Sequence, residues 1–292
     1  MPTALATVAV LLACLSGLAV SASSVAAPGA ATDSRTAPAR GTVVRNRLAA
    51  EPASLALTPA ISIVIDDIGN DWPEGRAAVD LPGPVTCAFL PHTPYAARLA
   101  RRAHARAKQV MLHLPMESID DRPLGPGGLT VTMGKPQFLR TLRADIDSIP
   151  YVSGVNNHMG SLLTQQPTQM RWLMHDLLYH GRLFFLDSRT TAQTVAQRAA
   201  MNNGLATTRR NVFLDNVQQP QAVRRRVEQL IELARRHGTA LGIGHPHPVT
   251  LAVLAEMLPT LEQRGIRLVP VSKLIQLKHE RRIRLWQASL SP

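Results

Sequence analysis

Short aliphatic stretches alternate with longer amphipathic stretches along most of the chain. The aliphatic stretches fall at 61–65, 85–90, 110–112, 152–155, 183–186, 212–214, 241–243 and 268–271. Helical spacing occurs between them, at 96–107, 136–146, 168–180, 195–202, 221–237 and 250–263. Short strands that alternate with helices are typical of a parallel sheet covered by helices. Seven or eight such strands predict an α/β fold, a complete or distorted (β/α) barrel, rather than an open doubly wound sheet.

The two ends of the chain differ from this alternating region. Positions 8–20 are apolar and small residues follow through Ala27, which predicts a secretory signal peptide over 1–27. No Lys or Arg precedes the apolar run, so an uncleaved N-terminal anchor is the alternative. Positions 28–60 are rich in Ala, Pro and Arg, as in a flexible linker. We expect a globular domain at 61–278, a basic tail at 279–292, and export to the periplasm or the extracellular space.

The charge of the chain bears on its partners. It carries 32 Lys and Arg against 20 Asp and Glu, a formal charge of +12. This excess favours association with anionic surfaces such as phospholipid headgroups or acidic envelope polymers. The basic residues are scattered and show no zinc-finger or basic-zipper spacing, so nucleic acid is not an expected partner. Cys14 lies inside the expected signal, and Cys87 alone would form no intrachain disulfide.

Polar residues follow directly after five of the predicted strands. They are the segments 66–69 (DDIG), 113–117 (HLPME), 156–161 (NNHMGS), 187–190 (DSRT) and 244–248 (GHPHP). A (β/α) barrel gathers the carboxyl ends of its strands at one face, where its active site lies. We therefore expect these segments to converge on one site.

The first of these segments begins with two adjacent carboxylates, Asp66 and Asp67. Past the end of a strand, both side chains can turn toward a site. One can then bind a cation, which relieves the repulsion between them, while the other stays free as a base. The alternative for the pair is a helix N-cap.

Histidines in the next two segments supply nitrogen ligands. Pro115 disfavours a helix after His113, so His113 and Glu117 are expected in a loop, as is His158. Together with Asp67, the two histidines offer one oxygen and two nitrogens. Three protein ligands with one open water position are the arrangement of a catalytic zinc site.

The last segment contains two histidines, His245 and His247, on either side of Pro246. An imidazole titrates near neutral pH and can protonate a leaving group. His245 lies closer to the predicted strand, but the spacing does not choose between the two. A second metal site or a structural loop is the alternative. Asp187 and Arg189 are expected to hold an imidazole or its neighbour in place.

Taken in order, the segments VIDDIG, VMLHLPME, GVNNHMGS, FFLDSRT and GIGHPHP resemble the motifs of the divergent polysaccharide deacetylase family. The resemblance covers about 61–275, nearly the whole expected domain, and implies the distorted (β/α) barrel of the wider polysaccharide deacetylase superfamily. It implies that Asp66 is the general base and Asp67 a metal ligand. It also implies that His245 or His247 is the general acid.

Two motifs depart from the superfamily pattern. Its second motif has two metal-binding histidines four residues apart, and Glu117 stands where the second would be, so either His158 or Glu117 completes the ligand set. The superfamily's third motif usually has an Arg and a Pro, and this sequence has Asn157 and His158 near that place. The resemblance implies a metal-dependent hydrolase, with zinc favoured, that removes N-acetyl or O-acetyl groups from an envelope or extracellular glycan. The alternatives are hydrolysis of another amide or ester, and a catalytically degenerate barrel that acts as a glycan-binding or scaffolding module.

Overall fold

The computed structural model describes residues 58–120, 122–181 and 183–290. The expected signal peptide and the linker up to residue 57 lie outside the described residues. The described chain forms one parallel sheet in the order β6-β5-β4-β3-β2-β1-β8-β7, with β9 paired to β1. The strands are β1 (Ala60–Ile68), β2 (Thr86–Phe89), β3 (Gln109–Met116), β4 (Val152–Met159), β5 (Phe184–Asp187), β6 (Thr207–Arg209), β7 (Val212–Phe213), β8 (Thr239–Gly244) and β9 (Arg267–Leu268).

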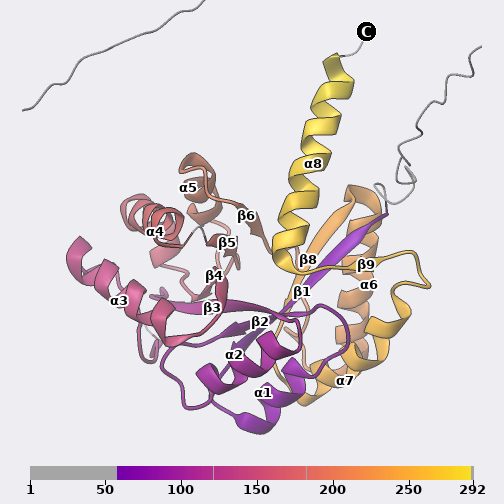
Figure 1. Ribbon diagram of the computed structural model, residues 1–292, viewed down its shortest axis with the longest axis horizontal. Coiled ribbons are helices and arrows are strands. Elements are labelled where there is room, and N and C mark those ends of the chain that lie inside the picture. The colour runs from indigo at the N-terminus through magenta and orange to yellow at the C-terminus, as the bar shows by residue number, and fades with distance from the viewer. Residues whose placement is uncertain (1–57, 121, 182, 291–292) are drawn as a thin grey trace, which may run out of the picture. The chain divides into compact units, whose positions relative to one another are not determined.

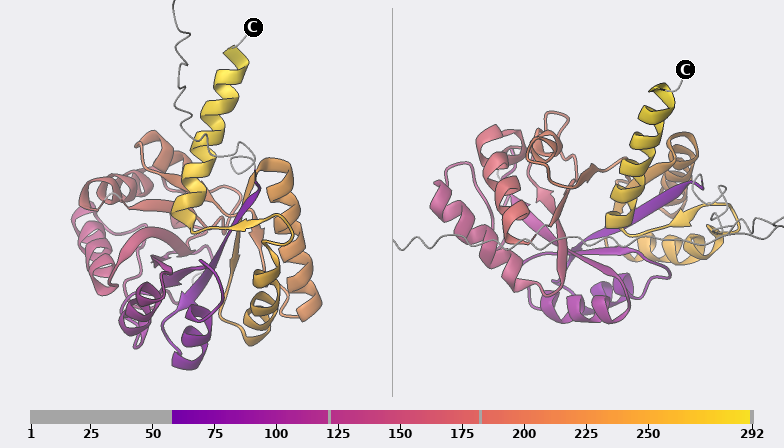
Figure 2. Two further views of the ribbon diagram at one scale, coloured as in Figure 1. Left: turned by 45° about the vertical axis from the view of Figure 1, so that its right-hand side comes forward. Right: turned by 45° about the horizontal axis from the view of Figure 1, so that its top comes forward.

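Helices surround this sheet (Figures 1 and 2). They are α1 (Trp72–Val79), α2 (Ala96–Ala105), α3 (Lys135–Ser148), α4 (Pro167–His180), α5 (Ala196–Asn202), α6 (Pro220–His237), α7 (Pro248–Met257) and α8 (Val271–Leu290), with short 3-10 turns η2 (Leu163–Gln165) and η3 (Leu258–Thr260). Strands β6 and β7 form the two edges of the sheet, and because only two residues link them the sheet curls to bring its edges near each other. The two edge strands do not pair, so the barrel stays open as a half-barrel. This confirms the predicted distorted (β/α) barrel.

Side chains of the strands alternate between the inside and the outside of the barrel, because a strand has a period of two. On β1, Ile61, Ile63 and Ile65 belong to the outer core, whereas Ala60 and Val64 belong to the inner core. The same alternation fills the barrel interior from the other strands, with Ala88, Met111, Phe184, Leu186, Leu241 and Ile243.

The next inward position toward the carboxyl end of these strands is polar. Two residues after Val64 comes Asp66; two after Met111 comes His113; two after Ile243 comes His245. The same periodicity that packs apolar side chains inside the barrel therefore aims polar side chains at its carboxyl end.

The amino-terminal end of the barrel is closed by the start of α8. Val271 is buried in the inner core, as is Leu274. The backbone N–H of Val271 donates to Oγ1 of Thr86 (3.3 Å), at the start of β2, and that of Ser272 donates to Oε1 of Gln109 (3.1 Å), at the start of β3. The remainder of α8 projects from the barrel in Figures 1 and 2. It exposes Ile283, Leu285, Trp286 and Leu290.

Several elements differ from the prediction. Strands β1, β3 and β4 run past their aliphatic stretches into the polar residues that follow, because parallel pairing of β3 and β4 continues to Met116 and Met159. The short elements α1 and β6 carry too little apolar periodicity for the pattern to predict them. The stretch at 268–271 is a strand only to Leu268, and α8 continues to Leu290 through most of the expected tail.

Within the described ranges, no helix combines the length and the apolar character needed to cross a membrane.

Candidate active site

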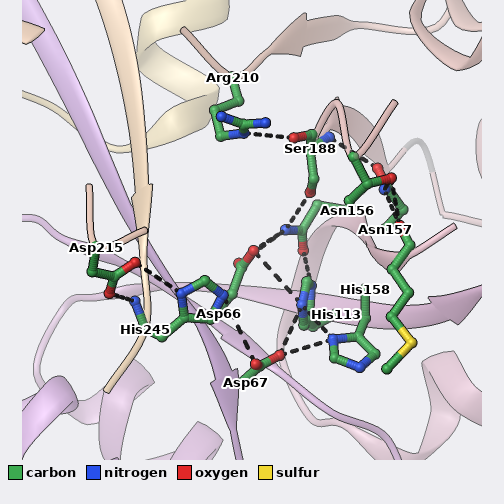
Figure 3. Close-up of polar contacts among 12 residues, drawn as sticks. Asp66, Asp67, His113, Asn156, Asn157, His158, Ser188, Arg210, Asp215 and His245 are labelled. Carbon is green, nitrogen blue, oxygen red and sulfur yellow. Dashed lines mark hydrogen bonds and ion pairs between the residues drawn. The ribbon is translucent and has the colours of Figure 1, made fainter. Parts of the chain in front are cut away.

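Polar residues at the carboxyl ends of the strands meet around a cavity of about 490 Å³. Strands β1, β3, β4 and the end of β8 bring together five of the six residues expected to bind metal or act in catalysis. These are Asp66, Asp67, His113, His158 and His245. Figure 3 shows how their side chains point toward one another.

Asp66 and Asp67 both face the cavity although they are neighbours on β1. A regular strand would point them to opposite sides. The backbone of Asp67 has a left-handed conformation, with φ of 57°, and the pairing of β1 with β2 shifts register between Ile65 and Ile68. This irregularity turns the side chain of Asp67 into the cavity. The following helix is capped by Asp71, so the pair does not serve as its N-cap.

Asp67, His113 and His158 form a compact cluster of ligand-type atoms. Oδ1 of Asp67 lies 3.1 Å from Nε2 of His113 and 2.9 Å from Nδ1 of His158, and the two ring nitrogens are 3.2 Å apart. The two histidines were expected in loops. They lie instead on the adjacent strands β3 and β4, which fix the rings more firmly than loops would.

The bonding of Asp67 fits a cation. Its Oδ1 is buried and makes no hydrogen bond with the described residues, even though two imidazole nitrogens lie close by. Burial raises the pKa of the Asp67 carboxyl, but the contacts with His113 and His158 outweigh burial and hold this pKa well below its usual range. An ionised carboxylate with two imidazoles is a donor set that zinc accepts. The three side chains therefore fit a divalent metal ion.

Asn156 links this cluster to Asp66. Its amide nitrogen donates to Oδ1 and Oδ2 of Asp66 (2.9 and 3.0 Å), and its carbonyl oxygen accepts a hydrogen bond from Nδ1 of His113 (3.1 Å). A proton on Nδ1 leaves the lone pair of His113 on Nε2, which faces Asp67. Burial raises the pKa of Asp66 above its ordinary value, against the opposing effects of His113, His245 and Asn156.

His245 enters the cavity at the end of β8 and is oriented by Asp215. Nδ1 of His245 donates to Oδ1 of Asp215 (3.0 Å), while Oδ2 of Asp215 accepts from the backbone N–H of His245 (2.6 Å) and from the Thr250 hydroxyl (2.9 Å). Nε2 of His245 lies 3.8 Å from Oδ2 of Asp67. Burial disfavours the charged ring, but the Asp215 hydrogen bond and the nearby carboxylates raise the pKa of His245 to about 9. This shift favours the charged ring, with a proton on each nitrogen.

His247 points elsewhere. Its Nε2 contacts the side-chain amide of Gln218 at 3.0 Å, and the residue precedes α7 as its N-cap. Asp215, His245 and His247 form a second group whose ligand-type atoms lie near one another. However, both carboxylate oxygens of Asp215 already accept hydrogen bonds. The Asp67 cluster is thus better suited to an ion, and His245 is the histidine that faces the cavity.

The chain was compared with known proteins. Residues 63–275 match the family model described as divergent polysaccharide deacetylase. The chain belongs to this family. Its relative YibQ from Escherichia coli K12 is 37% identical over 223 residues, which cover 76% of this chain and 69% of YibQ. A protein from Haemophilus influenzae is 35% identical over 214 residues, covering 73% of this chain and 76% of the relative.

Solved structures share the fold. The crystal structure of ATU2773 from Agrobacterium tumefaciens C58 has a TM-score of 0.71 at 24% identity and covers 74% of this chain and 89% of that protein. The Lactam Utilization Protein from Thermus thermophilus has a TM-score of 0.51 at 14% identity and covers 72% of this chain and 99% of that protein. At these identities the likeness concerns the fold alone.

Glu117 stands where the second histidine of the superfamily's second motif would be, and it holds a loop in place. Its carboxylate accepts a hydrogen bond from the backbone N–H of Val131 (2.6 Å), and it does not belong to the Asp67 cluster. Of the two residues that could complete the ligand set, the structure thus brings His158 to Asp67.

The residues expected to support an imidazole support loops instead. Asp187 accepts hydrogen bonds from the backbone N–H groups of Arg189 (2.9 Å) and Gln197 (3.3 Å). The side chain of Arg189 is exposed, and the supporting role given to this pair belongs to Asp215. Asn157 lines the cavity and joins two strand ends, since its Oδ1 accepts from the backbone N–H of Ser188 (2.9 Å).

Three residues that were not predicted also contribute to this region: Asn156, Asp215 and Arg210. Asp215 follows the stretch 212–214 directly, so the strand-end criterion used elsewhere would have found it. Asn156 opens the third segment and shares the inward face of β4 with His158, two residues on. Arg210 precedes a predicted strand rather than following it, and no sequence signal marks it.

Proposed function

We propose that this protein is a metal-dependent hydrolase that removes acetyl groups from a glycan. The observation that carries the proposal is the arrangement around one cavity of a three-ligand cluster, a buried carboxylate and a carboxylate-paired histidine. Membership of the divergent polysaccharide deacetylase family supports a glycan as the substrate.

Asp67, His113 and His158 would hold the metal, and their oxygen and nitrogen donors favour zinc. When bound, such an ion lowers the pKa of water from about 15.7 to about 7 and polarises a carbonyl group. Asn156 accepts the hydrogen bond from Nδ1–H of His113 and so favours the tautomer whose Nε2 lone pair is available to this ion.

Asp66 acts as the general base in this proposal. Its carboxylate takes a proton from the attacking water, and burial makes it a stronger base than a solvated aspartate. The two hydrogen bonds from Asn156 keep the carboxylate oriented toward the cavity.

His245 acts as the general acid. Because Asp215 accepts a hydrogen bond from Nδ1–H, the protonated ring has its second N–H, at Nε2, available in the cavity. This proton passes to the nitrogen or oxygen that leaves when the acetyl group is hydrolysed. Asp215 stabilises the charged ring before that transfer.

Metal analysis of the purified mature chain tests the ligand assignment. We expect about one zinc per chain in the wild type and in a His247→Gln control, and little in the Asp67→Asn, His113→Gln and His158→Gln variants. Normal metal content in the three variants would contradict the assignment. Loss of metal in His247→Gln would move the site to the second group, around Asp215.

Acetate release tests the reaction. Acetylated oligosaccharides with N-acetyl or O-acetyl groups are incubated with the metal-loaded protein, and Asp66→Asn serves as the matched variant that retains the ligands. We expect release by the wild type and a loss of about 10²- to 10⁴-fold in the variant. Unchanged release in Asp66→Asn contradicts the proposed base. Bound metal without any release favours the alternative of a glycan-binding or scaffolding module.

We also propose that the protein is exported and can associate with anionic membrane surfaces. The apolar stretch at 8–20 with the small residues after it supports export. On α8, Arg282 and Arg284 flank the exposed Ile283, and the exposed Trp286 follows two residues after Arg284, a composition that suits an anionic lipid surface. Cell fractionation with determination of the mature N-terminus tests export, and retention in the cytosol contradicts it. Stronger binding to vesicles with anionic lipid than to zwitterionic vesicles is expected, and equal binding contradicts the association.

A further inference from the structure

We propose that Arg210 forms an anion-binding subsite in the wall of the active-site cavity, and that the substrate is an acetylated glycan bearing a carboxylate. This inference rests on the proposed deacetylase function and adds a class of substrate to it. Arg210 lines the same cavity as Asp66, Asp67 and His245.

The position of Arg210 is fixed by the break in the sheet. It lies on the two-residue link between β6 and β7, the two edges of the half-barrel. Its backbone N–H donates to the carbonyl of Asp187 (3.0 Å), and the next residue, Asn211, donates to the carbonyl of Leu241 (2.9 Å). The link is thus tied to both sides of the opening, and the Arg210 side chain enters the cavity between them.

The guanidinium group is held in place by neutral partners. Its Nε donates to the carbonyl of Ser188 (2.6 Å), and Nη2 donates to the carbonyl of Arg189 (2.7 Å). The group also lies over the ring of Phe213, 5.0 Å from its centroid. Figure 3 shows Arg210 beside Ser188, with Asn156 and Asp66 beyond it. A guanidinium oriented in this way loses little further freedom when it binds an anion.

No carboxylate of the described residues contacts this guanidinium. Among the described residues, none lies at ion-pair distance from Arg210, and its Nη1 donates no hydrogen bond. By contrast, other arginines are paired with acids: Arg102 with Asp80, Arg143 with Asp176, Arg224 with Glu256 and Arg264 with Glu228. Arg210 is half-buried. Burial and the nearby charge of Arg189 lower its pKa, and the carboxylates of Asp66 and Asp187 oppose this shift from beyond ion-pair distance. A half-buried cation with no counter-charge in contact is unfavourable, and an anion bound directly to it in the cavity would offset that cost.

The other acids of the cavity do not pair with Arg210. Asp67 faces two imidazoles and Asp120 pairs with Arg122 (2.7 Å). Asp66 is held by the Asn156 amide beyond ion-pair distance of the guanidinium. The positive charge of Arg210 is therefore available to a ligand. A guanidinium edge matches the plane of a carboxylate. Such a group could belong to the sugar ring of a hexuronic acid or to a carboxyalkyl ether on a hexosamine.

The test compares acetylated oligosaccharides that differ only in the carboxylate, present as the free acid or as its neutral carboxamide. One pair carries the acid on a uronic ring and the other on an ether side chain. The proteins are the metal-loaded wild type, Arg210→Gln, Arg210→Lys, and Arg224→Gln as a control on the outer surface of the domain. Acetate release gives kcat/KM for each combination.

We expect the wild type and Arg224→Gln to prefer one free acid over its carboxamide by about 10- to 100-fold, the effect of one charge-assisted hydrogen-bonded pair. Arg210→Gln should remove this preference, because its loss of kcat/KM on the free acid should exceed its loss on the carboxamide by the same factor. Arg210→Lys should retain a reduced preference. The pair that shows the preference identifies the source of the carboxylate.

Two results would overturn the proposal. One is the absence of any preference in the wild type. The other is an equal loss of kcat/KM on acid and carboxamide in Arg210→Gln, which would make Arg210 a support for the loop at 188–189 only.

A second measurement does not depend on hydrolysis: calorimetry of the binding of the deacetylated, carboxylated sugars to the wild type and to Arg210→Gln. If they bind through Arg210 but no substrate releases acetate, the subsite stands and the proposed reaction fails. If acetate is released without a charge preference, the reaction stands and the subsite fails.

Discussion

The pairing of His245 with Asp215 gives a prediction that needs no substrate. Replacing Asp215 by Asn removes the negative charge that lies 3.0 Å from Nδ1 of His245 and keeps the size of the side chain. The hydrogen bond from the Thr250 hydroxyl can persist on the amide oxygen. We therefore expect the pKa of His245 to fall from its raised value of about 9 while the fold is retained.

The size of this fall follows from the distance. Two unit charges at 3.0 Å attract by ~1.4 kcal/mol in bulk water and by ~5.5 kcal/mol at an effective dielectric constant of ~20. Because ~1.4 kcal/mol corresponds to one pKa unit, the pKa of His245 should fall by at least about one unit. The Asp215 carboxylate is fully buried and the His245 ring is largely buried, so water screens the pair only in part and the fall in pKa should exceed the aqueous limit.

The assay is a nuclear magnetic resonance titration of imidazole nitrogens in the metal-free chain. His247→Gln assists the assignment of the His245 signal. Thr250→Val is the control, since it removes a hydrogen bond to Asp215 but no charge, and should move the pKa of His245 much less than Asp215→Asn does. A His245 pKa in Asp215→Asn within half a unit of the wild type would refute the proposed electrostatic coupling.

Three further predictions concern other parts of the domain. Gly154→Ala should destabilise the fold by about 1–3 kcal/mol, because its Cβ would lie 2.3 Å from the Phe184 ring inside the barrel. Phe184→Leu should partly restore the thermal midpoint of that variant, and an unchanged midpoint in Gly154→Ala alone would contradict this packing. Burial raises the pKa of Asp145 to about 8, above its unfolded value, so its contribution to stability falls as pH rises from about 4 to about 8. Asp145→Asn should therefore raise the midpoint at pH 8 and flatten its dependence on pH, and a lowered midpoint at pH 8 argues against it. Asn156→Ala should weaken zinc binding about 10- to 100-fold in a chelator competition, and wild-type affinity would exclude its role in orienting His113.

The fold was predictable because its periodicity is local. Each strand buries alternate residues and each helix buries one face, so the barrel follows from short-range patterns. The convergence of Asp66, His113 and His245 follows from the same alternation, continued by two residues beyond the last apolar position inside the barrel.

Other features depend on contacts between distant segments and leave no local pattern. The left-handed backbone at Asp67 arises where β1 shifts its register against β2. The length of β3 and β4 depends on their mutual pairing, which carries His113 and His158 into strands. Arg210 gains its place from the gap between β6 and β7, which exists only in the assembled sheet.

Because all the strands run parallel, the cavity lies at one end of the barrel and α8 covers the other. Ala60 begins β1 at the end that α8 closes, where it pairs with Thr239 and Arg267. The covalent connection to the preceding residues and the projecting half of α8 therefore both leave the domain at the pole opposite the cavity. A domain held through that pole would keep this cavity facing outward. Under the proposed function, it would act on glycan strands that pass by in solution or in a surrounding matrix, rather than on the surface to which it is held.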